Sequence, residues 1–190
     1  MLKRMIGVLI LRPAVYLEIA KDTTATGQAA VIIAAALFIQ GVIEGLIQAK
    51  DQTGVLTPSP AHLIGSAFAV LISGLIAWVI TAWFLTIAAR LLGGRTNTGE
   101  MLRVTGYVEI FTIVIILSIP GLAVPALSFL VDVFAVIGAL LGLLGYLIGV
   151  SESADLSIRR AFVASSAAGI INLLIVVFLA DMTLRVLRIW

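Results

Sequence analysis

Five long apolar stretches constrain what this chain can fold into. A helix that crosses a bilayer needs roughly 20 apolar residues, because each residue advances about 1.5 Å through a hydrocarbon core about 30 Å thick. The stretches are continuous and do not alternate with a period of two, which favours helices over a β-barrel. They predict spanning helices over residues 28–48, 63–89, 101–119, 125–150 and 161–182.

Composition excludes most soluble classes of protein. Apolar residues make up 62% of the 190 residues and charged residues 12%, against about half and about a quarter in a soluble domain. A soluble globule has too little interior for so many apolar side chains, so we expect an all-α integral membrane protein. The net charge of +2 is small and the basic residues are scattered, which argues against a nucleic-acid partner. The absence of cysteine excludes disulfides and thiolate sites.

Residues 1–24 differ from the remainder, because their apolar clusters are short and flanked by basic residues. Pro13 lies between two clusters, where it can begin a helix. The pattern predicts one or two amphipathic helices on the cytoplasmic membrane surface, followed by a five-helix bundle over residues 25–190. A signal peptide is the competing interpretation. Its apolar region would be very short, Arg12-Pro13 interrupts it, and no small-residue cleavage site follows.

Turn and cap residues separate the predicted spans. Pro58 and Pro60 break the chain before the second span, and Gly93-Gly94 follows it. Asn97 with Glu100 three residues later is typical of a capping box at the start of the third span.

The distribution of basic residues predicts the orientation of the chain. With five spans, nine of the twelve lysines and arginines fall on the side that holds the N-terminus. Cytoplasmic segments are enriched in these residues, so we expect the N-terminus in the cytoplasm and the C-terminus outside. The expected location is a prokaryotic plasma (inner) membrane.

Ionisable residues within spans are candidates for a functional site, because each costs about 2.5–3.5 kcal/mol to insert at the centre of a bilayer. Glu109 lies ten residues before Ile119, and Asp132 lies eleven residues after Gly121. A hairpin at Pro120-Gly121 would place both carboxylates at a similar depth, with Asp132 shallower if its helix begins at Pro125. Two close carboxylates share a proton or a cation. Together with Asn172 in the fifth span, they predict a proton or cation site.

A structural role for these carboxylates is the alternative, in which each is hydrogen-bonded within the bundle. Hydroxyl partners are available locally, among them Thr105, Tyr107, Thr112 and Ser128. Glu44 lies one turn from the outer end of the first span, where it is expected to reach water. Gln40 lies one turn further in, on the same helix face.

Four glycines lie on one face of the fourth span, at spacings of four, three and four residues: Gly138, Gly142, Gly145 and Gly149. Small residues allow a neighbouring helix to approach closely, so they predict packing within the bundle or between protomers. His62 is the single histidine and is expected in an outer loop, without partners for a metal. No nucleophile elbow, His-Glu-x-x-His helix or Walker loop is present, so we expect no enzymatic activity, cofactor or metal.

Four short motifs, spread over most of the chain, are informative when taken together. They are Arg12-Pro13 with Tyr16, Glu18 and Ile19; Leu91-Leu92-Gly93-Gly94 with Glu100, Arg103, Val104, Gly106 and Tyr107; Pro120-Gly121; and Glu152, Leu156, Ser157, Arg160 and Ala161. With these motifs the sequence resembles the Yip family, five-span membrane proteins first named as Ypt/Rab-interacting proteins, in the short prokaryotic form. The resemblance implies a five-helix bundle with the N-terminus inside. The Asp-Leu-Tyr-Gly-Pro motif and long cytosolic region of eukaryotic relatives are lacking, so Rab GTPase binding is not expected.

Several of these polar residues fall near the cytoplasmic face: Glu100, Arg103, Tyr107, Glu152, Ser157, Arg159 and Arg160. They predict either charge pairs between the cytoplasmic links or, through Arg103, Arg159 and Arg160, a site for anionic lipid headgroups. The favoured function is a non-enzymatic protein that organises or shapes the membrane. Its partners would be the lipid bilayer and a second copy or other membrane proteins. A small carrier or channel using Glu109 and Asp132, or a lipid-handling protein, is the alternative.

Overall fold

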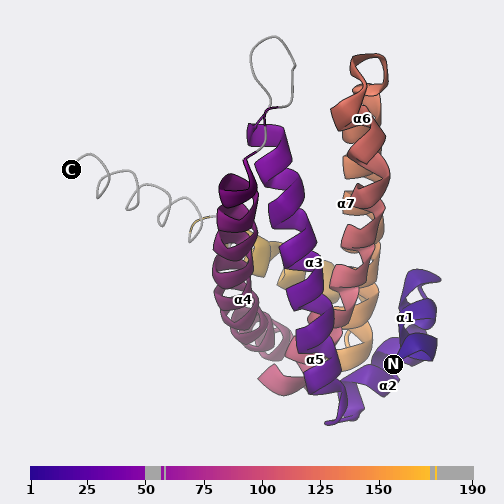
Figure 1. Ribbon diagram of the computed structural model, residues 1–190. Coiled ribbons are helices and arrows are strands. Elements are labelled where there is room, and N and C mark those ends of the chain that lie inside the picture. The colour runs from indigo at the N-terminus through magenta and orange to yellow at the C-terminus, as the bar shows by residue number, and fades with distance from the viewer. Residues whose placement is uncertain (50–56, 58, 172–173, 175–190) are drawn as a thin grey trace.

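The chain folds into a bundle of long helices with two short helices packed at one end. The computed structural model describes residues 1–49, 57, 59–171 and 174, and these residues contain helices and no strands (Figure 1). The elements are α1 (Leu2–Leu9), α2 (Pro13–Lys21), α3 (Ala25–Gln48), α4 (Pro60–Leu91), α5 (Thr98–Val108), the 3₁₀ helix η1 (Glu109–Ser118), α6 (Ile119–Ala123), the 3₁₀ helix η2 (Pro125–Leu127) and α7 (Phe129–Ala154). A final helix covers residues 158–171.

Four segments of the described chain are long and apolar enough to cross a membrane: Ala25–Gln48, Pro60–Leu91, Thr98–Leu122 and Pro125–Ala154. They correspond to the first four predicted spans. The fifth predicted span, residues 161–182, begins within the final helix, but most of its second half lies outside the described residues. Five spans therefore remain a prediction.

The predicted helix start at Asn97 is confirmed, and α4 also begins with a capping side chain, three residues before the predicted span. The Asn97 side chain accepts the backbone N–H of Glu100, at 3.0 Å from Oδ1 to nitrogen, and begins α5. The Ser59 hydroxyl accepts the backbone N–H of His62 at 3.1 Å, with Pro60 in the first turn of α4. His62 is thus an exposed residue of a helical first turn and not of a loop. Among the described residues no group of three metal-binding side chains is found.

The third span changes its helix type at Glu109. The segment is α-helical to Val108 and continues as η1 from Glu109 to Ser118, whereas the sequence pattern predicts one uniform spanning helix over residues 101–119. This stretch is rich in β-branched residues, which lower α-helix propensity because they crowd the preceding turn. A 3₁₀ helix has three residues per turn, so side chains three apart are stacked in one row.

The two N-terminal helices form, but α2 does not lie on the outside of the bundle. Tyr16, Ile19 and Ala20 of α2 are fully buried against α5 and α7. Their apolar face is covered by protein, because α2 lies beneath the ends of the long helices (Figure 1). An exposed apolar face is left mainly on α1, where Leu2 is 70% exposed and Ile10, the residue after the helix, is 66% exposed.

Two buried clusters hold the helices together. One joins α1, α2, α3, α5 and η1 around Tyr16, Tyr107 and Phe111. The other joins α4, α5, α7 and the final helix, and consists largely of small residues such as Ala82, Ala161 and Ala164. Apolar side chains gain little from leaving lipid, so close approach of small residues supplies much of the packing attraction in a membrane.

The four glycines of α7 do not share one packing role. A Cβ added at Gly145 would clash with Phe111, and one added at Gly149 would clash with Val104 and meet Tyr16 at 3.2 Å. Both therefore pack inside the bundle. Gly142 has no other atom within 4 Å of such a Cβ, and at Gly138 the contacts are ordinary. The predicted packing face is thus confined to the half of α7 near α2.

This difference predicts opposite results for one substitution at two glycines of α7. Gly149→Val forces a side chain into Val104 and Tyr16, and overpacking of this kind costs about 1–3 kcal/mol. Gly142→Val has the same change in helix propensity but meets open space. Thermal unfolding of the purified proteins in detergent should show a lower Tm for the first variant alone. Equal melting temperatures would contradict this packing of α7.

Candidate functional site

Glu109 lies where α5 gives way to η1, inside the bundle and partly buried. Its carboxylate accepts a hydrogen bond from the hydroxyl of Thr112, at 3.2 Å from Oγ1 to Oε2. The 3₁₀ geometry stacks these two residues, which are three positions apart. Thr112 was one of the local partners expected from the sequence. No salt bridge joins Glu109 to a basic side chain in the described part of the chain.

A cavity of about 600 Å³ between the long helices has Glu109 in its wall. Five long elements besides η1 contribute to it: α3, α4, α5, α7 and the final helix. Its polar lining consists of Gln40, Trp78, Thr81, Thr105, Glu109, Tyr146, Ser165 and Ser166. The rest is apolar, including Leu37, Leu143 and Phe162. We call this cavity the central chamber.

A second cavity of about 350 Å³ lies between η1 and α7. Three residues line both cavities: Gln40, Glu109 and Tyr146. Glu109 also lines a third, smaller and mainly apolar cavity of about 160 Å³ beside Met1 and Met5. Glu109 therefore lines three cavities of the bundle, and its carboxylate can hold a proton or neutralise a bound cation.

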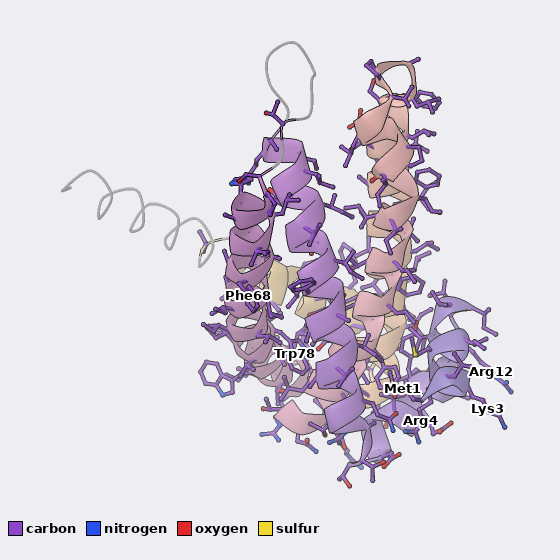
Figure 2. The ribbon with its side chains drawn as sticks, viewed as in Figure 1. Met1, Lys3, Arg4, Arg12, Phe68 and Trp78 are labelled. Atoms are coloured by element: carbon purple, nitrogen blue, oxygen red, sulfur yellow. The ribbon has the colours of Figure 1, made fainter. Side chains whose placement is uncertain are left out.

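Two consecutive hydrogen bonds hold the side chains of Trp78 and Thr105, which line the central chamber. Trp78 projects from α4 into the bundle (Figure 2) and donates its indole N–H to the Thr105 hydroxyl at 2.9 Å. Thr105 in turn donates to the Met101 carbonyl at 2.7 Å. The Ser165 hydroxyl, by contrast, is buried without a hydrogen-bond partner in the described structure. The lining of the chamber thus contains one hydrogen-bonded polar pair, Trp78 and Thr105, and one buried hydroxyl without a partner in the described structure, that of Ser165.

The structure does not bring Asp132 to Glu109. Gly121 packs against Leu130 and Val131, so Asp132 lies level with the turn of the hairpin, where it is exposed. Glu109 lies several helical turns further in, opposite the part of α7 that carries Tyr146. The expected equal depth fails because α6 and η2 occupy residues 119–127 and α7 begins only at Phe129. The third residue of the predicted site, Asn172, lies outside the described residues.

The sequence predicts that Gln40 extends a polar stripe with Glu44, and both residues belong to the continuous helix α3. Glu44 is exposed near the outer end of α3, whereas Gln40 is partly buried and lines the central chamber. Tyr146 and Ser165 were not singled out for the site. Their positions depend on how α7 and the final helix are rotated against α3 and η1, and no local sequence signal reports that rotation.

The polar residues at the basic end, where α2 meets α5, form a buried network. Arg103 donates to the Ala20 carbonyl through Nε at 3.0 Å and through Nη2 at 2.6 Å, and to the Thr26 hydroxyl at 3.3 Å. Ala20 lies in the last turn of α2, whose carbonyls lack helical partners. Arg103 therefore caps α2 from within α5, where a positive charge also complements the helix dipole.

Glu100 and Tyr107 complete this network. The Glu100 carboxylate accepts from Lys21 Nζ at 3.1 Å and from the Thr96 hydroxyl at 3.0 Å. Tyr107 donates its hydroxyl to the Gln28 side chain on α3. Among the described residues, no ion pair joins the two later cytoplasmic links as the sequence predicts. The ion pair of this group instead joins Lys21 at the end of α2 to Glu100 of α5, and the neutral Tyr107–Gln28 hydrogen bond joins α5 to α3.

Those two links meet mainly through the backbone. The Arg95 N–H donates to the Ala154 carbonyl at 2.8 Å, and Arg160 Nη1 donates to the Leu92 carbonyl at 3.3 Å. Ser157 and Arg159 are exposed, and Glu152 lines a cavity of about 420 Å³ with Lys21 and Arg95. Since Arg103 is buried and engaged, it is not free for the predicted lipid-headgroup site.

A third polar group docks α1 onto α2. Arg4 donates to Glu18 at 2.8 Å and to Asp22 at 2.6 Å, and the Tyr16 hydroxyl donates to the Val8 carbonyl at 3.1 Å. The Thr24 hydroxyl and backbone N–H also donate to Asp22, and with Arg4 they lower the pKa of that carboxyl to about 2. The two carboxylates raise the pKa of Arg4, while burial raises that of Tyr16.

Removing the Arg103 side chain should loosen α2. Arg103→Met leaves the Ala20 carbonyl without its donors, and an unpaired buried polar group costs about 1–3 kcal/mol. We expect a lower Tm and faster tryptic cleavage after Lys21. Arg160→Met is the matched control, because Arg160 is exposed and makes one long hydrogen bond. Equal protection of Lys21 in both variants would contradict the capping role.

The docking of α1 should weaken in acid. The folded pKa of Asp22 lies below its ordinary value of 3.8, so its contribution is present above about pH 4 and is lost as the pH falls through about 2. Hydrogen-exchange protection factors of the α1 amides should decrease over this interval. In Asp22→Asn this dependence should be absent, whereas Asp155→Asn, at the exposed end of α7, should retain it. If the protection factors of Asp22→Asn still decrease in acid, a group other than Asp22 causes the response.

Comparison with known proteins agrees with this architecture. The family model described as Yip1 domain matches residues 6–180, which includes α2, the four apolar spanning segments and the final helix. No curated protein and no solved structure matches the chain. The matched region covers nearly the whole sequence, and the chain is an integral membrane protein that belongs to the Yip1-domain family.

Proposed function

We propose that this protein is a non-enzymatic organiser of the membrane that inserts α1 into the cytoplasmic leaflet as a wedge. The observation that carries the proposal is an apolar face on α1 that no described part of the chain covers. Its exposed residues are Met1, Leu2, Ile6, Leu9 and Ile10, of which Leu2 is 70% exposed. Apolar faces of this kind, next to basic residues, bind at the boundary between headgroups and acyl chains.

The opposite side of α1 is firmly held by the bundle. Gly7 lies so close to Val15 that an added Cβ would come within 2.6 Å of it, and Val8 is fully buried. After Leu9 the Leu11 N–H donates to the Val8 carbonyl and the Arg12 N–H to the Gly7 carbonyl, a Schellman-type ending. Leu11 adopts a left-handed conformation with φ of 55° to make this turn. Because α1 is packed on α2 and α2 on the spanning helices, the position of α1 along the membrane normal is set by those helices.

Charge supports the cytoplasmic placement of this wedge. Lys3 and Arg12 are exposed and project away from the bundle beside α1 (Figure 2). Basic residues near an anionic surface contribute about 1 kcal/mol each to membrane attraction. The nine basic residues expected in the cytoplasm all belong to segments at this end. We infer a cytoplasmic N-terminus in a prokaryotic plasma membrane, and a fifth span that takes the C-terminus outside.

The test measures both the position and the effect of α1. The chain has no cysteine, so Leu2→Cys and Lys3→Cys each carry one nitroxide label. In vesicles with anionic lipid we expect the label at position 2 to be accessible to oxygen in the acyl region and the label at position 3 to a water-soluble nickel complex. Labels equally exposed to water would contradict the wedge.

The effect on membrane shape is tested with a matched pair of substitutions. Leu2→Asn combined with Ile6→Asn removes the apolar face. We expect electron microscopy to show narrow, highly curved vesicles with the unmodified protein and to show none with this variant. Leu91→Asn is the control, because Leu91 is 82% exposed at the end of α4 and lies outside α1. Identical vesicle shapes with all three proteins would overturn the organiser proposal.

A further inference from the structure

We propose that the central chamber binds a monovalent organic cation with apolar substituents, and that Glu109 neutralises its charge. The chamber volume of about 600 Å³ falls within the range of about 300–1,000 Å³ typical of small-molecule sites. This inference is independent of the α1 wedge, because the wedge lies on the outside of the bundle and the chamber lies between the long helices.

The sign of the ligand charge follows from the lining. Among the described residues that form the chamber, Glu109 is the single carboxylate, and none is lysine, arginine or histidine. A carboxylate within a spanning segment is costly unless it is protonated or paired. Thr112 supplies one hydrogen bond but no charge. A cation in the chamber supplies the missing charge, and a proton on Glu109 replaces it when the chamber is empty.

The rest of the lining favours an organic cation over a metal ion. Metal ions such as Ca²⁺ need six or more oxygen ligands, and no group of three acidic, histidine or cysteine side chains is found in the described chain. The walls are mainly apolar and include the aromatic rings of Trp78, Tyr146 and Phe162. Aromatic rings attract organic cations, and apolar walls accommodate their substituents. Both features match a lipophilic ammonium or phosphonium ion.

A second observation points to an occupant. The Ser165 Oγ atom is buried and has no hydrogen-bond partner in the described structure, although Ser165 lines the chamber. Leaving a buried hydroxyl without a hydrogen-bond partner is unfavourable. Together with Gln40, it offers a polar contact to a bound molecule. Gln40, Glu109 and Tyr146 also line the second cavity, so a ligand at the carboxylate is accessible from two hollows.

Equilibrium binding of tetraphenylphosphonium to the full chain tests the site. We expect saturable binding to the unmodified protein in detergent, accompanied by release of a proton in weakly buffered solution. Glu109→Gln should weaken binding about tenfold or more and abolish proton release, because it removes the charge and retains the shape. Glu44→Gln is the matched control, since Glu44 is an exposed carboxylate on α3. Neutral triphenylphosphine oxide should bind no more than weakly.

A measurement on the unmodified protein keeps the test valid if Glu109→Gln fails to fold. A hydrophobic carbodiimide takes up the proton of a carboxylic acid in an apolar site, and the carboxylate oxygen then adds to its central carbon. Mass spectrometry should find this adduct, or the N-acylurea to which it rearranges, on Glu109. Tetraphenylphosphonium should protect Glu109 from labelling. Absence of binding, equal binding by Glu109→Gln, or labelling of Glu109 that the cation does not reduce would each overturn the proposal.

The source of the natural cation is distinguished by lipid composition. In nanodiscs of phosphatidylethanolamine, a lipid ammonium headgroup that occupies the chamber would compete with tetraphenylphosphonium and weaken its binding relative to phosphatidylglycerol nanodiscs. Equal affinity in both lipids assigns the chamber to a free cation. Either result supports an ammonium-type ligand, provided that binding still requires Glu109.

Discussion

The capping of α2 by Arg103 is the interaction on which the N-terminal half of the structure depends. A guanidinium within α5 supplies donors to the Ala20 carbonyl and to Thr26, so it holds the end of α2 and the first turn of α3 at once. With α2 held, Tyr16 fills the space left by Gly145 and Gly149. Because α1 docks on α2 through Arg4, its depth relative to the spanning helices also follows from this contact.

Insertion of η1 into the membrane and the presence of Glu109 within it are energetically opposed. Continuous apolar residues favour insertion of η1, whereas Glu109 must be hydrogen-bonded, protonated or paired within it. The 3₁₀ helix meets part of this demand, since it stacks Thr112 on Glu109. Glu109 also lines three cavities. A chain that needed only a stable bundle would gain from an apolar residue at this position, so the carboxylate is the feature that most needs a functional explanation.

Much of the fold could be predicted from the sequence, because lipid imposes a length and an apolar composition on each span. The four spanning segments and the cap at Asn97 follow from local patterns. Burial of α2 could not be predicted in the same way. Its apolar residues have the same pattern whether lipid or protein covers them, and only the glycines of α7 provide the space for Tyr16.

The candidate site was harder to predict because it depends on register and rotation. Counting residues from Pro120-Gly121 assumed a tight turn, but α6 and η2 lengthen it and displace Asp132 outward. Glu109 and Thr112 were identifiable because an acidic residue in an apolar segment is conspicuous and its partner is three residues away. Gln40, Tyr146 and Ser165 come from three other helices, and their convergence is a property of the tertiary packing.

The length of α4 has a consequence for the surrounding bilayer. Its 32 residues extend for about 48 Å, well beyond a hydrocarbon core of about 30 Å. Tilts of spanning helices reach about 40°, which reduces the thickness covered by α4 only to about 37 Å. The ends of α4, which carry His62 and Arg90, therefore extend past the hydrocarbon core into the headgroup region. Basic and polar side chains at this level are stable beside water and lipid headgroups, so the two ends of α4 anchor the bundle on both sides of the membrane.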